Sequence, residues 1–541
     1  MKLNTIVLPL VLLLGLPTIA WSQLTFITNN GTITITGYTG STSVLVIPST
    51  TNGYPVTSIT TNAFNGGNYF VDVTVPEGVT TIGDSAFWDC WYLSNVSLPN
   101  SLTKIGDFAF YLCSDLTNAP LGNSLTNIGA YAFSLTALIS VILPESLLTI
   151  GEYGYSGSPM TNLIFGTNLV SIGDDAFNSC SGFSSVRIPD TVTNLGQWAF
   201  AFCDGIQSVK VGRGVTAISS NIFADCINLT NLTMLGAINS WAGRAFDNCP
   251  DLASATLAEG TTLIGNGAFQ GCSKLAYCPI PDTVTTIGNS AFEDCVSLTN
   301  SNGTIPNSVT NIGSYAFSGT HLTSFDFPTN IGENIGDGAF SDTLLTNLII
   351  PPSITSIGNG WFGGCAYLTN VTFPDTLTYI GPNAFGGCSS LLSTTIPASV
   401  TNVGSFAFYD TVFLNGIYFA GNAPVLGMNA FGGENDGLLY SATLYYLPGT
   451  TDWTPTYGGY TDILWNPQAQ TGDGFFGVRT NRFGFNITGT SNVMFVVEAC
   501  TNLAHPVWQP LGTYTLTGSP VYFSDAQWMN WPGRYYRFRS P

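Results

Sequence analysis

One segment of 23 residues is repeated along most of this chain, and it constrains the fold more than any other feature. IGDSAFWDCWYLSNVSLPNSLTK (82–104) is followed at once by IGDFAFYLCSDLTNAPLGNSLTN (105–127). A fixed period of this length is the signature of a solenoid. The aromatic residue of Ala-Phe, here called the anchor, recurs every 23 residues, with a few steps of 22 and one of 25, at Phe64, Phe87, Phe110, Phe133, Tyr155, Phe177, Phe200, Phe223, Phe246, Phe269, Phe292, Phe317, Phe340, Phe362, Phe385, Phe408 and Phe431.

Each repeat has three parts. Segments such as LSNVSLP (93–99) alternate apolar and polar residues and end at Pro, which predicts a half-buried strand. The Ile-Gly that follows indicates a turn or a close backbone approach. The x-x-A-F-x-x-C-x-x-L segment has apolar residues three or four apart, which predicts a short helical or 3-10 turn. Because one repeat cannot cover its own apolar side chains, we expect about 17 stacked coils, with parallel strands on one face and these turns on the other.

The frame I-G-x-x-A-F-x-x-C-x-x-L-x-x-V-x-I-P, over residues 55–431, resembles the BspA-type leucine-rich repeat of secreted and surface proteins in bacteria and some protists. The resemblance implies a leucine-rich-repeat solenoid in the form of an arc or superhelix. For some members of the family it also implies adhesion to host matrix proteins or to other cells.

The segments outside the frame suggest how the chain is divided. After residue 474, short alternating runs such as MFVVEAC and YYRFRS predict a small all-β sandwich. This segment is similar to a module found at the C-termini of many secreted bacterial proteins. The predicted parts are a signal peptide (1–22), an N-terminal β cap (23–54), the repeats (55–431), a C-terminal cap (432–465), a linker (466–474) and a β-sandwich module (475–541).

The first residues predict export. Lys2 precedes an apolar run from Ile6 to Leu16, and Ala20-Trp21-Ser22 provides a small-x-small cleavage site. The apolar run is short for a membrane span, and no later stretch is long and apolar enough to form one. We therefore expect a secreted or cell-surface protein without a transmembrane segment once the signal is removed.

The charge distribution argues against one class of partner. The chain has a formal net charge of −20 at pH 7, yet five of its twelve basic residues follow residue 470: Arg479, Arg482, Arg534, Arg537 and Arg539. Nucleic-acid binding requires many Lys and Arg contacts to phosphate. An acidic repeat region excludes this role.

Ten of the twelve cysteines occupy one position of the repeat, three residues after the anchor: Cys90, Cys113, Cys180, Cys203, Cys226, Cys249, Cys272, Cys295, Cys365 and Cys388. Other repeats have Thr there, as at Thr136 and Thr320. This exchange predicts a position that requires a small, semi-polar, buried side chain. A ladder of buried thiols is the favoured interpretation, although neighbouring coils could also bring two sulfurs within disulfide range. Neither C-x-x-C nor a paired His supports a metal site.

The sequence lacks the motifs of catalysis. Only two histidines are present, His321 and His505, and no G-x-S-x-G elbow accompanies them. The acids are scattered over turn positions such as IGD, PDT and PES, where we expect solvated loops. The two G-x-G-x-x-G matches, 358–363 and 472–477, open no long helix after a strand. We expect neither an enzyme nor a cofactor.

Strand alternation identifies the side chains that should point outward from the concave strand face. They are mainly small hydroxyls and amides, with a local basic spot where Arg187 and Lys210 fall in successive coils. The candidate ligand-binding residues are Asn95, Ser97, Ser185, Arg187, Ser208, Lys210, Asn231, Thr233, Asn370 and Thr372.

Three functions remain open from the sequence. The first is an adhesin-like protein that binds an extracellular matrix or cell-surface protein through the strand face, since solenoids bind by area. The second is a surface protein that binds a polysaccharide, which would favour a row of exposed aromatic residues. The third is a spacer that presents the C-terminal module. Small polar residues also suit exposed strands without any ligand.

Overall fold

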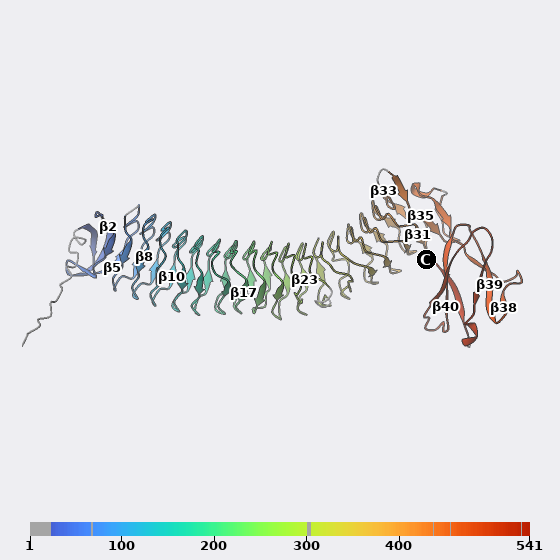
Figure 1. Cartoon of the computed structure of the whole chain (residues 1–541), viewed down its shortest axis with the longest axis horizontal. Helices are drawn as coiled ribbons and strands as arrows, with labels where there is room; N and C mark the ends of the chain where they lie inside the picture. The colour runs from blue at the N-terminus through green and yellow to red at the C-terminus, as the bar shows by residue number, and fades with distance from the viewer. Residues whose placement is uncertain (1–22, 67–68, 300–304, 436–437, 455, 532) are drawn as a thin grey trace, which may run out of the picture. The chain divides into compact units, whose positions relative to one another are not determined.

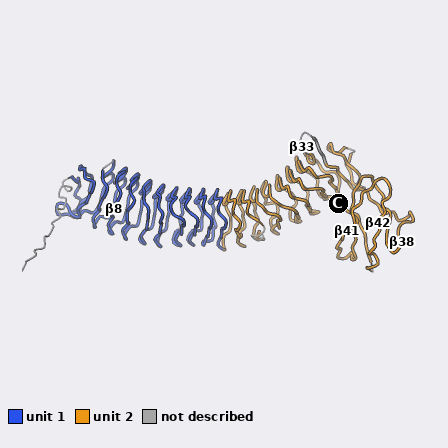
Figure 2. The backbone as a smooth tube through the Cα atoms, viewed as in Figure 1, with its two compact units in different colours: residues 1–258 blue, residues 259–541 orange. Residues whose placement is uncertain are grey.

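The computed structural model describes residues 23–66, 69–299, 305–435, 438–454, 456–531 and 533–541. The predicted signal peptide lies outside them. The chain divides into two compact units, residues 1–258 and 259–541 (Figure 2). Within the described residues, no helix is long and apolar enough to cross a membrane.

Unit 1 is a stack of parallel strands (Figure 1). An antiparallel hairpin, β1 with β2, begins the stack, and β4 (Thr50–Thr51) pairs antiparallel with β5. The two-residue strands extend this hairpin into one sheet, in the order β1 (Leu24–Asn29), β2 (Thr32–Tyr38), β5 (Tyr54–Ile59), β7 (Thr81–Ile82), β9 (Lys104–Ile105), β10 (Asn127–Ile128), β12 (Thr149–Ile150), β14 (Ser171–Ile172) and β16 (Asn194–Leu195). The strand β18 (Ala217–Ile218) pairs with β20 (Ser240–Trp241).

The strands that carry the alternating pattern form a second series in unit 1, in three sheets. These are β3 (Val44–Val46), β6 (Asp72–Thr74) and β8 (Asn95–Ser97); β11 (Ser140–Ile142) and β13 (Asn162–Ile164); and β15 (Ser185–Arg187), β17 (Ser208–Val211), β19 (Asn231–Met234) and β21 (Ser254–Thr256).

Unit 2 continues with the same kind of coil and ends in the C-terminal module. Its coil strands are β22 (Leu263–Ile264), β23 (Thr286–Ile287) and β24 (Asn311–Ile312); β25 (Asn347–Ile349) and β27 (Asn370–Thr372); β26 (Ser356–Ile357), β28 (Tyr379–Ile380), β30 (Asn402–Val403) and β32 (Val425–Leu426); and β29 (Ser393–Ile396), β31 (Gly416–Phe419), β35 (Thr443–Tyr446) and β36 (Asp462–Leu464). A hairpin of β33 (Gly432–Asn435) and β34 (Leu438–Ser441) and a 3-10 turn, η3 (Tyr457–Gly459), lie near the last coil. The predicted parallel-strand solenoid of about 17 coils is confirmed.

The anchors form the core of the coils. In unit 1, Phe87 stacks on Phe110 with ring centroids 5.1 Å apart, and Phe200 stacks on Phe223 at 5.2 Å. In unit 2, Phe385 stacks on Phe408 at 5.2 Å. Burial of one such side chain contributes about 1.5–3 kcal/mol, so every coil is stabilised by its neighbours.

The turn segment differs from the helical form that the spacing predicts. The described part of residues 39–438 holds no helical residue. Instead, the residues two before and two after an anchor adopt a left-handed backbone, as at Phe108 (φ 57°) and Leu112 (φ 61°) around Phe110. This conformation is unfavourable for residues other than glycine. Here it lets the two N–H groups donate to the next coil, to the carbonyls of Ala130 at 2.7 Å and Ser134 at 3.2 Å.

The cysteine position is a buried hydrogen-bond site. The Cys Sγ donates to the anchor carbonyl of the preceding coil at 3.1–3.3 Å, as Cys226 does to Phe200. In repeats with Thr, such as Thr320, the hydroxyl donates instead to its own coil's anchor carbonyl at 2.6–3.0 Å. All twelve cysteines are buried, and none of them forms a disulfide. Burial raises the pKa of the Cys180 and Cys226 thiols to about 12, so the proton for this hydrogen bond is retained at neutral pH.

Acidic and amide side chains at the turns have a role beyond solubility. The Asp107 Oδ1 accepts the N–H of Ala130 in the next coil at 2.8 Å, and the Glu145 Oε2 accepts the N–H of Thr167 at 2.7 Å. Hydrogen bonds from the Thr167 side chain and backbone lower the pKa of Glu145. The prediction that these acids only solvate loops was therefore incomplete, because they also satisfy backbone donors between coils.

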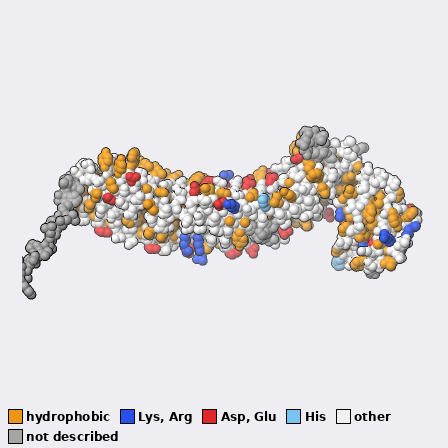
Figure 3. Space-filling model, viewed as in Figure 1, with side chains coloured by type: hydrophobic (Ala, Val, Ile, Leu, Met, Phe, Trp, Pro, Cys, Tyr) orange, Lys and Arg blue, Asp and Glu red, His pale blue; other side chains and the backbone are white. Residues whose placement is uncertain are grey.

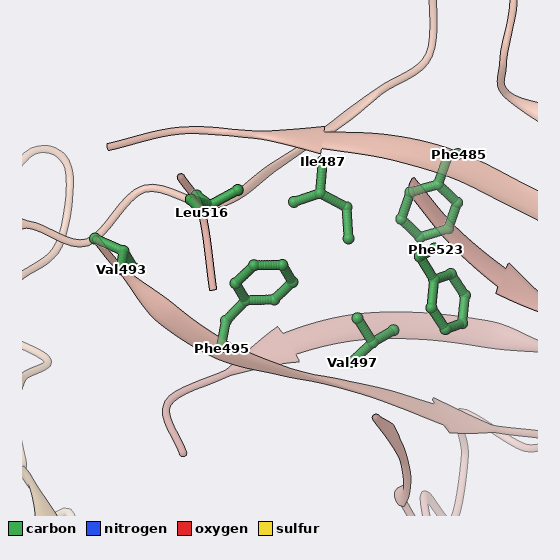
Figure 4. Packing of buried hydrophobic residues seen from close by; sticks show 7 residues of the cluster. All are labelled: Phe485, Ile487, Val493, Phe495, Val497, Leu516 and Phe523. Carbon is green, nitrogen blue, oxygen red and sulfur yellow. The ribbon is translucent and has the colours of Figure 1, made fainter. Parts of the chain in front are cut away.

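The C-terminal module consists of two antiparallel sheets around one core (Figure 4). Seven buried side chains, from Phe485 to Phe523, fill the space between the sheets. The sheets contain β37 (Gln468–Gln470), β38 (Gly477–Arg479), β39 (Arg482–Thr488) and β42 (Val521–Asp525), and β40 (Met494–Cys500), β41 (Gln509–Thr515) and β43 (Tyr535–Arg539), with a 3-10 turn, η4 (Trp528–Asn530). The predicted all-β domain is confirmed. The segment expected as a linker, 466–474, contributes β37 to the first sheet.

Within unit 2 the module contacts outward positions of a coil strand. The Ser393 hydroxyl donates to the Pro541 carbonyl at 3.1 Å, and the Thr395 and Ser540 hydroxyls lie 2.9 Å apart. The Trp465 Nε1 donates to the Met494 carbonyl at 3.1 Å. Part of the strand face at β29 is thus covered by the module.

Candidate binding surface

The alternation predicted for the longer strands is confirmed by their burial. In β8, β15 and β27 the first and third residues are exposed and the middle residue is buried. In β17 and β19 the outward residues Ser208, Lys210 and Thr233 are half-buried and Asn231 is exposed. Whether these residues bind a ligand stays a prediction.

Six of the ten predicted site residues lie in one four-stranded parallel sheet of unit 1. The pairing places Ser185 opposite Ser208 and Arg187 opposite Lys210. The next strand adds Asn231 beside Ser208 and Thr233 beside Lys210. Adjacent strands lie about 4.8 Å apart. The six side chains therefore form two parallel columns, here called the β15–β19 face.

The other four residues lie elsewhere. Asn95 and Ser97 are on β8, in a different sheet of unit 1, where the Asn95 amide donates to the Asp72 Oδ1 at 3.0 Å. Asn370 and Thr372 are on β27 in unit 2, paired with β25. The structure therefore groups the predicted site around Arg187 and Lys210 rather than spreading it over all ten positions.

The electrostatics of the β15–β19 face differ from those of the surrounding coils. Arg213 lies 3.5 Å from Asp190 and Arg244 lies 3.6 Å from Asp247, so these cations have carboxylate partners. Arg187 and Lys210 form no ion pair with any described residue. Like charges directly opposite each other on neighbouring strands are unfavourable, and a ligand carboxylate would relieve the repulsion. Figure 3 shows how sparse basic side chains are on the drawn face of the coils.

A row of aromatic residues on the turn side of unit 1 was not predicted from the sequence. Phe108 stacks on Tyr131 with centroids 4.8 Å apart, and Tyr131 stacks on Tyr153 at 4.6 Å. Trp88 extends the row. The signal was available, because Phe108, Tyr131 and Tyr153 each precede an anchor by two residues. The parallel rings face one another along the stack, which leaves little ring face for a sugar.

The described residues contain no group of three or more His, Cys, Asp or Glu side chains arranged to hold a metal ion. The two histidines, His321 and His505, are both exposed and lie in different segments. Burial raises the pKa of ladder thiols such as Cys90 to about 12, which opposes formation of the nucleophilic thiolate. The candidate binding surface is the β15–β19 face, because it groups six of the ten predicted residues in one sheet.

Stacked coils of about 23 residues with a leucine-rich frame define a leucine-rich-repeat solenoid. The model of the BspA-type leucine-rich repeat region, which spans six copies, matches residues 39–159, 148–276, 262–342 and 333–438. These matches cover more than half of the chain, and the chain belongs to this family. Membership suggests a surface or protein-binding role.

The chain is also similar to several solved structures of bacterial proteins, including leucine-rich-repeat proteins. A protein from Bacteroides ovatus is 21% identical, with 79% of this chain and 94% of that chain covered and a TM-score of 0.37. A leucine-rich cell surface protein from Faecalibacterium prausnitzii is 25% identical, with 74% and 94% covered and a TM-score of 0.31. The pneumococcal vaccine antigen PcpA is 16% identical, with 82% and 96% covered and a TM-score of 0.32. No curated protein matches the chain.

Proposed function

We propose that this chain is a non-enzymatic, extracytoplasmic binding protein that recognises an extracellular protein through the β15–β19 face. The repeat class supports the type of function, because leucine-rich-repeat proteins typically bind rather than catalyse. The signal-like first 22 residues support export. One of the similar structures is described as a cell surface protein.

One observation carries the assignment of the surface. Arg187 and Lys210 are neighbours in register on an acidic chain, and neither has a carboxylate partner among the described residues. Flanking hydroxyls and amides provide hydrogen bonds to an extended partner backbone. A partner with an acidic segment would satisfy both features, and electrostatic complementarity would accelerate its association.

The test uses the full chain and a panel of immobilised extracellular-matrix proteins. Arg187→Glu with Lys210→Glu should lower the affinity for the bound protein by about tenfold or more, mainly through slower association. Arg213→Glu with Arg244→Glu is the matched control, since it makes the same charge change on exposed side chains of the same unit. The control should bind like the unmodified chain.

Two results would contradict the proposal. Equal losses in both variants would mean that only the net charge matters. Binding to a polysaccharide array but to no matrix protein, unaffected by either variant, would move recognition away from this face.

A further inference from the structure

The outer face of one sheet of the C-terminal module is hollowed into a groove of about 760 Å³. Arg479, Arg482, Asn486 and Tyr522 are among its lining residues. The groove lies on the side of β39 opposite the core residues Phe485 and Ile487. Ligand sites in proteins commonly measure about 300–1,000 Å³, so the groove is large enough for a segment of a polymer.

The strand register brings unlike functional groups together there. β38 and β39 form an antiparallel hairpin in which Arg479 is directly opposite Arg482. On the other side of β39, Asn486 is opposite Tyr522. Gly477 and Gly484 are also opposite each other, and the absence of a side chain at Gly484 leaves room for the Tyr522 ring, which lies over it. The groove thus brings two guanidinium groups, an amide and a phenol together on one face of this sheet.

The two arginines at the hairpin have an unusual environment. Like charges directly opposite on neighbouring strands are destabilising unless something compensates them. Arg479 donates to the Gly474 carbonyl and lies 4.8 Å above the Phe475 ring. Arg482 is exposed and forms no ion pair with any described residue.

The other arginines of the module are matched by acids. Arg537 and Arg539 both pair with Glu498, and Arg534 pairs with Asp525 at 3.1 Å. The acid beside the groove, Asp473, is already engaged, because its carboxylate accepts the Phe475 N–H at 2.9 Å and the Asn486 amide at 2.8 Å. The groove therefore carries two arginine charges beside the single carboxylate of Asp473, which makes it a net basic site on a chain of net charge −20.

We propose that this groove binds a polysaccharide that bears carboxylate groups. Arginine forks pair with carboxylates through two parallel hydrogen bonds, which suits Arg479 and Arg482. Phe475 and Tyr522 are 46% and 43% exposed and provide apolar ring surface for a sugar. Asn486 and Ser524 offer hydrogen bonds to its hydroxyls. The site is separate from the β15–β19 face and does not depend on the function proposed for it.

The experiment compares two polymers on the full chain. Polygalacturonate is the charged probe, and the same polymer with its carboxyl groups reduced is the neutral probe. We expect binding of polygalacturonate that weakens as salt rises, and little binding of the reduced polymer. Arg479→Gln with Arg482→Gln should lower the affinity for polygalacturonate by about tenfold or more. Arg213→Gln with Arg244→Gln removes the same charge in unit 1 and should change nothing.

A second variant separates geometry from charge. Arg482→Lys keeps the positive charge but loses the planar fork, so it should lose part of the affinity. The Arg482 side chain is exposed and unpaired, so its variants should unfold at the same temperature as the unmodified chain. The proposal is overturned if the reduced polymer binds equally well, if both double variants lose binding equally, or if polyglutamate binds with the same dependence on Arg479 and Arg482.

Discussion

In the coils, an anchor is packed between copies of itself, whereas in the C-terminal module each core residue meets different neighbours. Phe223 lies between Phe200 and Phe246, with ring centroids 5.2 and 5.5 Å away and nearly parallel rings. Phe485 in the module instead contacts Phe523 at 5.2 Å and Tyr536 at 6.0 Å, at steep angles. The coils therefore gain stability through one repeated contact between neighbours.

Acidic side chains also occupy different environments in the coils and in the C-terminal module. The coils keep their acids at the surface, where they accept N–H groups of the next coil. The module buries Glu498 and Asp525, which are 4% and 6% exposed, and pairs them with arginines. A repeated core leaves only the surface free to vary, while a unique core can contain a specific charged cluster. Recognition in the coils is accordingly expected on their outward strand residues.

The largest expected effect comes from removing an anchor. Phe223→Ala should lower the free energy of unfolding by about 3–5 kcal/mol, because it leaves a cavity between two stacked rings. Denaturant unfolding followed by circular dichroism measures the change. Phe202→Ala, at a site where the ring is 44% exposed, is the matched control and should cost far less. Equal losses would contradict the stacked-anchor account.

In the module, the corresponding test removes the buried charge. Glu498→Gln should cost about 2–3 kcal/mol, since Arg537 and Arg539 lose their shared partner but remain partly exposed to water. Glu259→Gln, at an exposed site, should be close to neutral. If the two variants unfold alike in denaturant, the charged cluster does not stabilise the module.

Glu498 also makes the stability of the module depend on pH. Burial alone would raise the pKa of Glu498, but hydrogen bonds and charges from Arg539 and Arg537 outweigh it and lower the pKa below its usual value of 4.5. A lowered pKa stabilises the fold above pH 4.5, and this stability is lost as the pH falls through the folded-state value. The unfolding temperatures of the unmodified chain and of the Glu498→Gln variant should therefore converge as the pH falls below 4.5. A constant difference down to pH 2 would contradict this.

A smaller effect is expected at a glycine where two coils approach closely. A Cβ added to Gly106 would lie 2.6 Å from the Asp84 N and 2.7 Å from the Gly83 carbonyl carbon of the preceding coil. Gly106→Ala should therefore cost about 1–3 kcal/mol. Gly472→Ala, with no atom within 4 Å of the added Cβ, is the control for the module region and should be nearly neutral in the same unfolding assay. A neutral Gly106→Ala would mean that the coils can separate easily.

The smallest effect concerns the cysteine position. Cys226→Thr should be nearly neutral, because Thr occupies this position in other repeats and supplies a hydroxyl donor. Cys226→Val has the shape of the Thr variant but has no donor and loses the hydrogen bond to the Phe200 carbonyl, so it should cost about 1 kcal/mol. Unfolding midpoints of the two variants provide the comparison, and a Val variant as stable as the Thr variant would show that only size matters.

The coil architecture could be predicted from the sequence because a repeat averages out local ambiguity. The 23-residue spacing of the anchors gave the stacking, and the alternation in NVS (95–97) gave the buried Val96 and its exposed neighbours. The exchange of Cys with Thr indicated a semi-polar buried position, although its acceptor, an anchor carbonyl, could not be inferred from one repeat alone.

The missed features depend on contacts between coils. Apolar residues three or four apart suggested helix, but Phe108 and Leu112 take a left-handed backbone because the next coil offers acceptors for their N–H groups. The β15–β19 face could be identified only in part, since the sequence placed Arg187 and Lys210 in successive coils but did not show that Asn95 and Asn370 belong to other sheets. Propensity describes a single chain segment and does not include its stacked neighbour.

One binding measurement tests the separation of the two regions most directly. Surface plasmon resonance would measure two double variants, one that carries Arg187→Glu and Lys210→Glu and one that carries Arg479→Gln and Arg482→Gln. Each would be tested on the immobilised matrix protein and on polygalacturonate. We predict that the first pair weakens only protein binding and the second pair weakens only polygalacturonate binding. If both pairs weaken the same ligand, or if neither pair weakens either ligand, then recognition does not reside on these two surfaces.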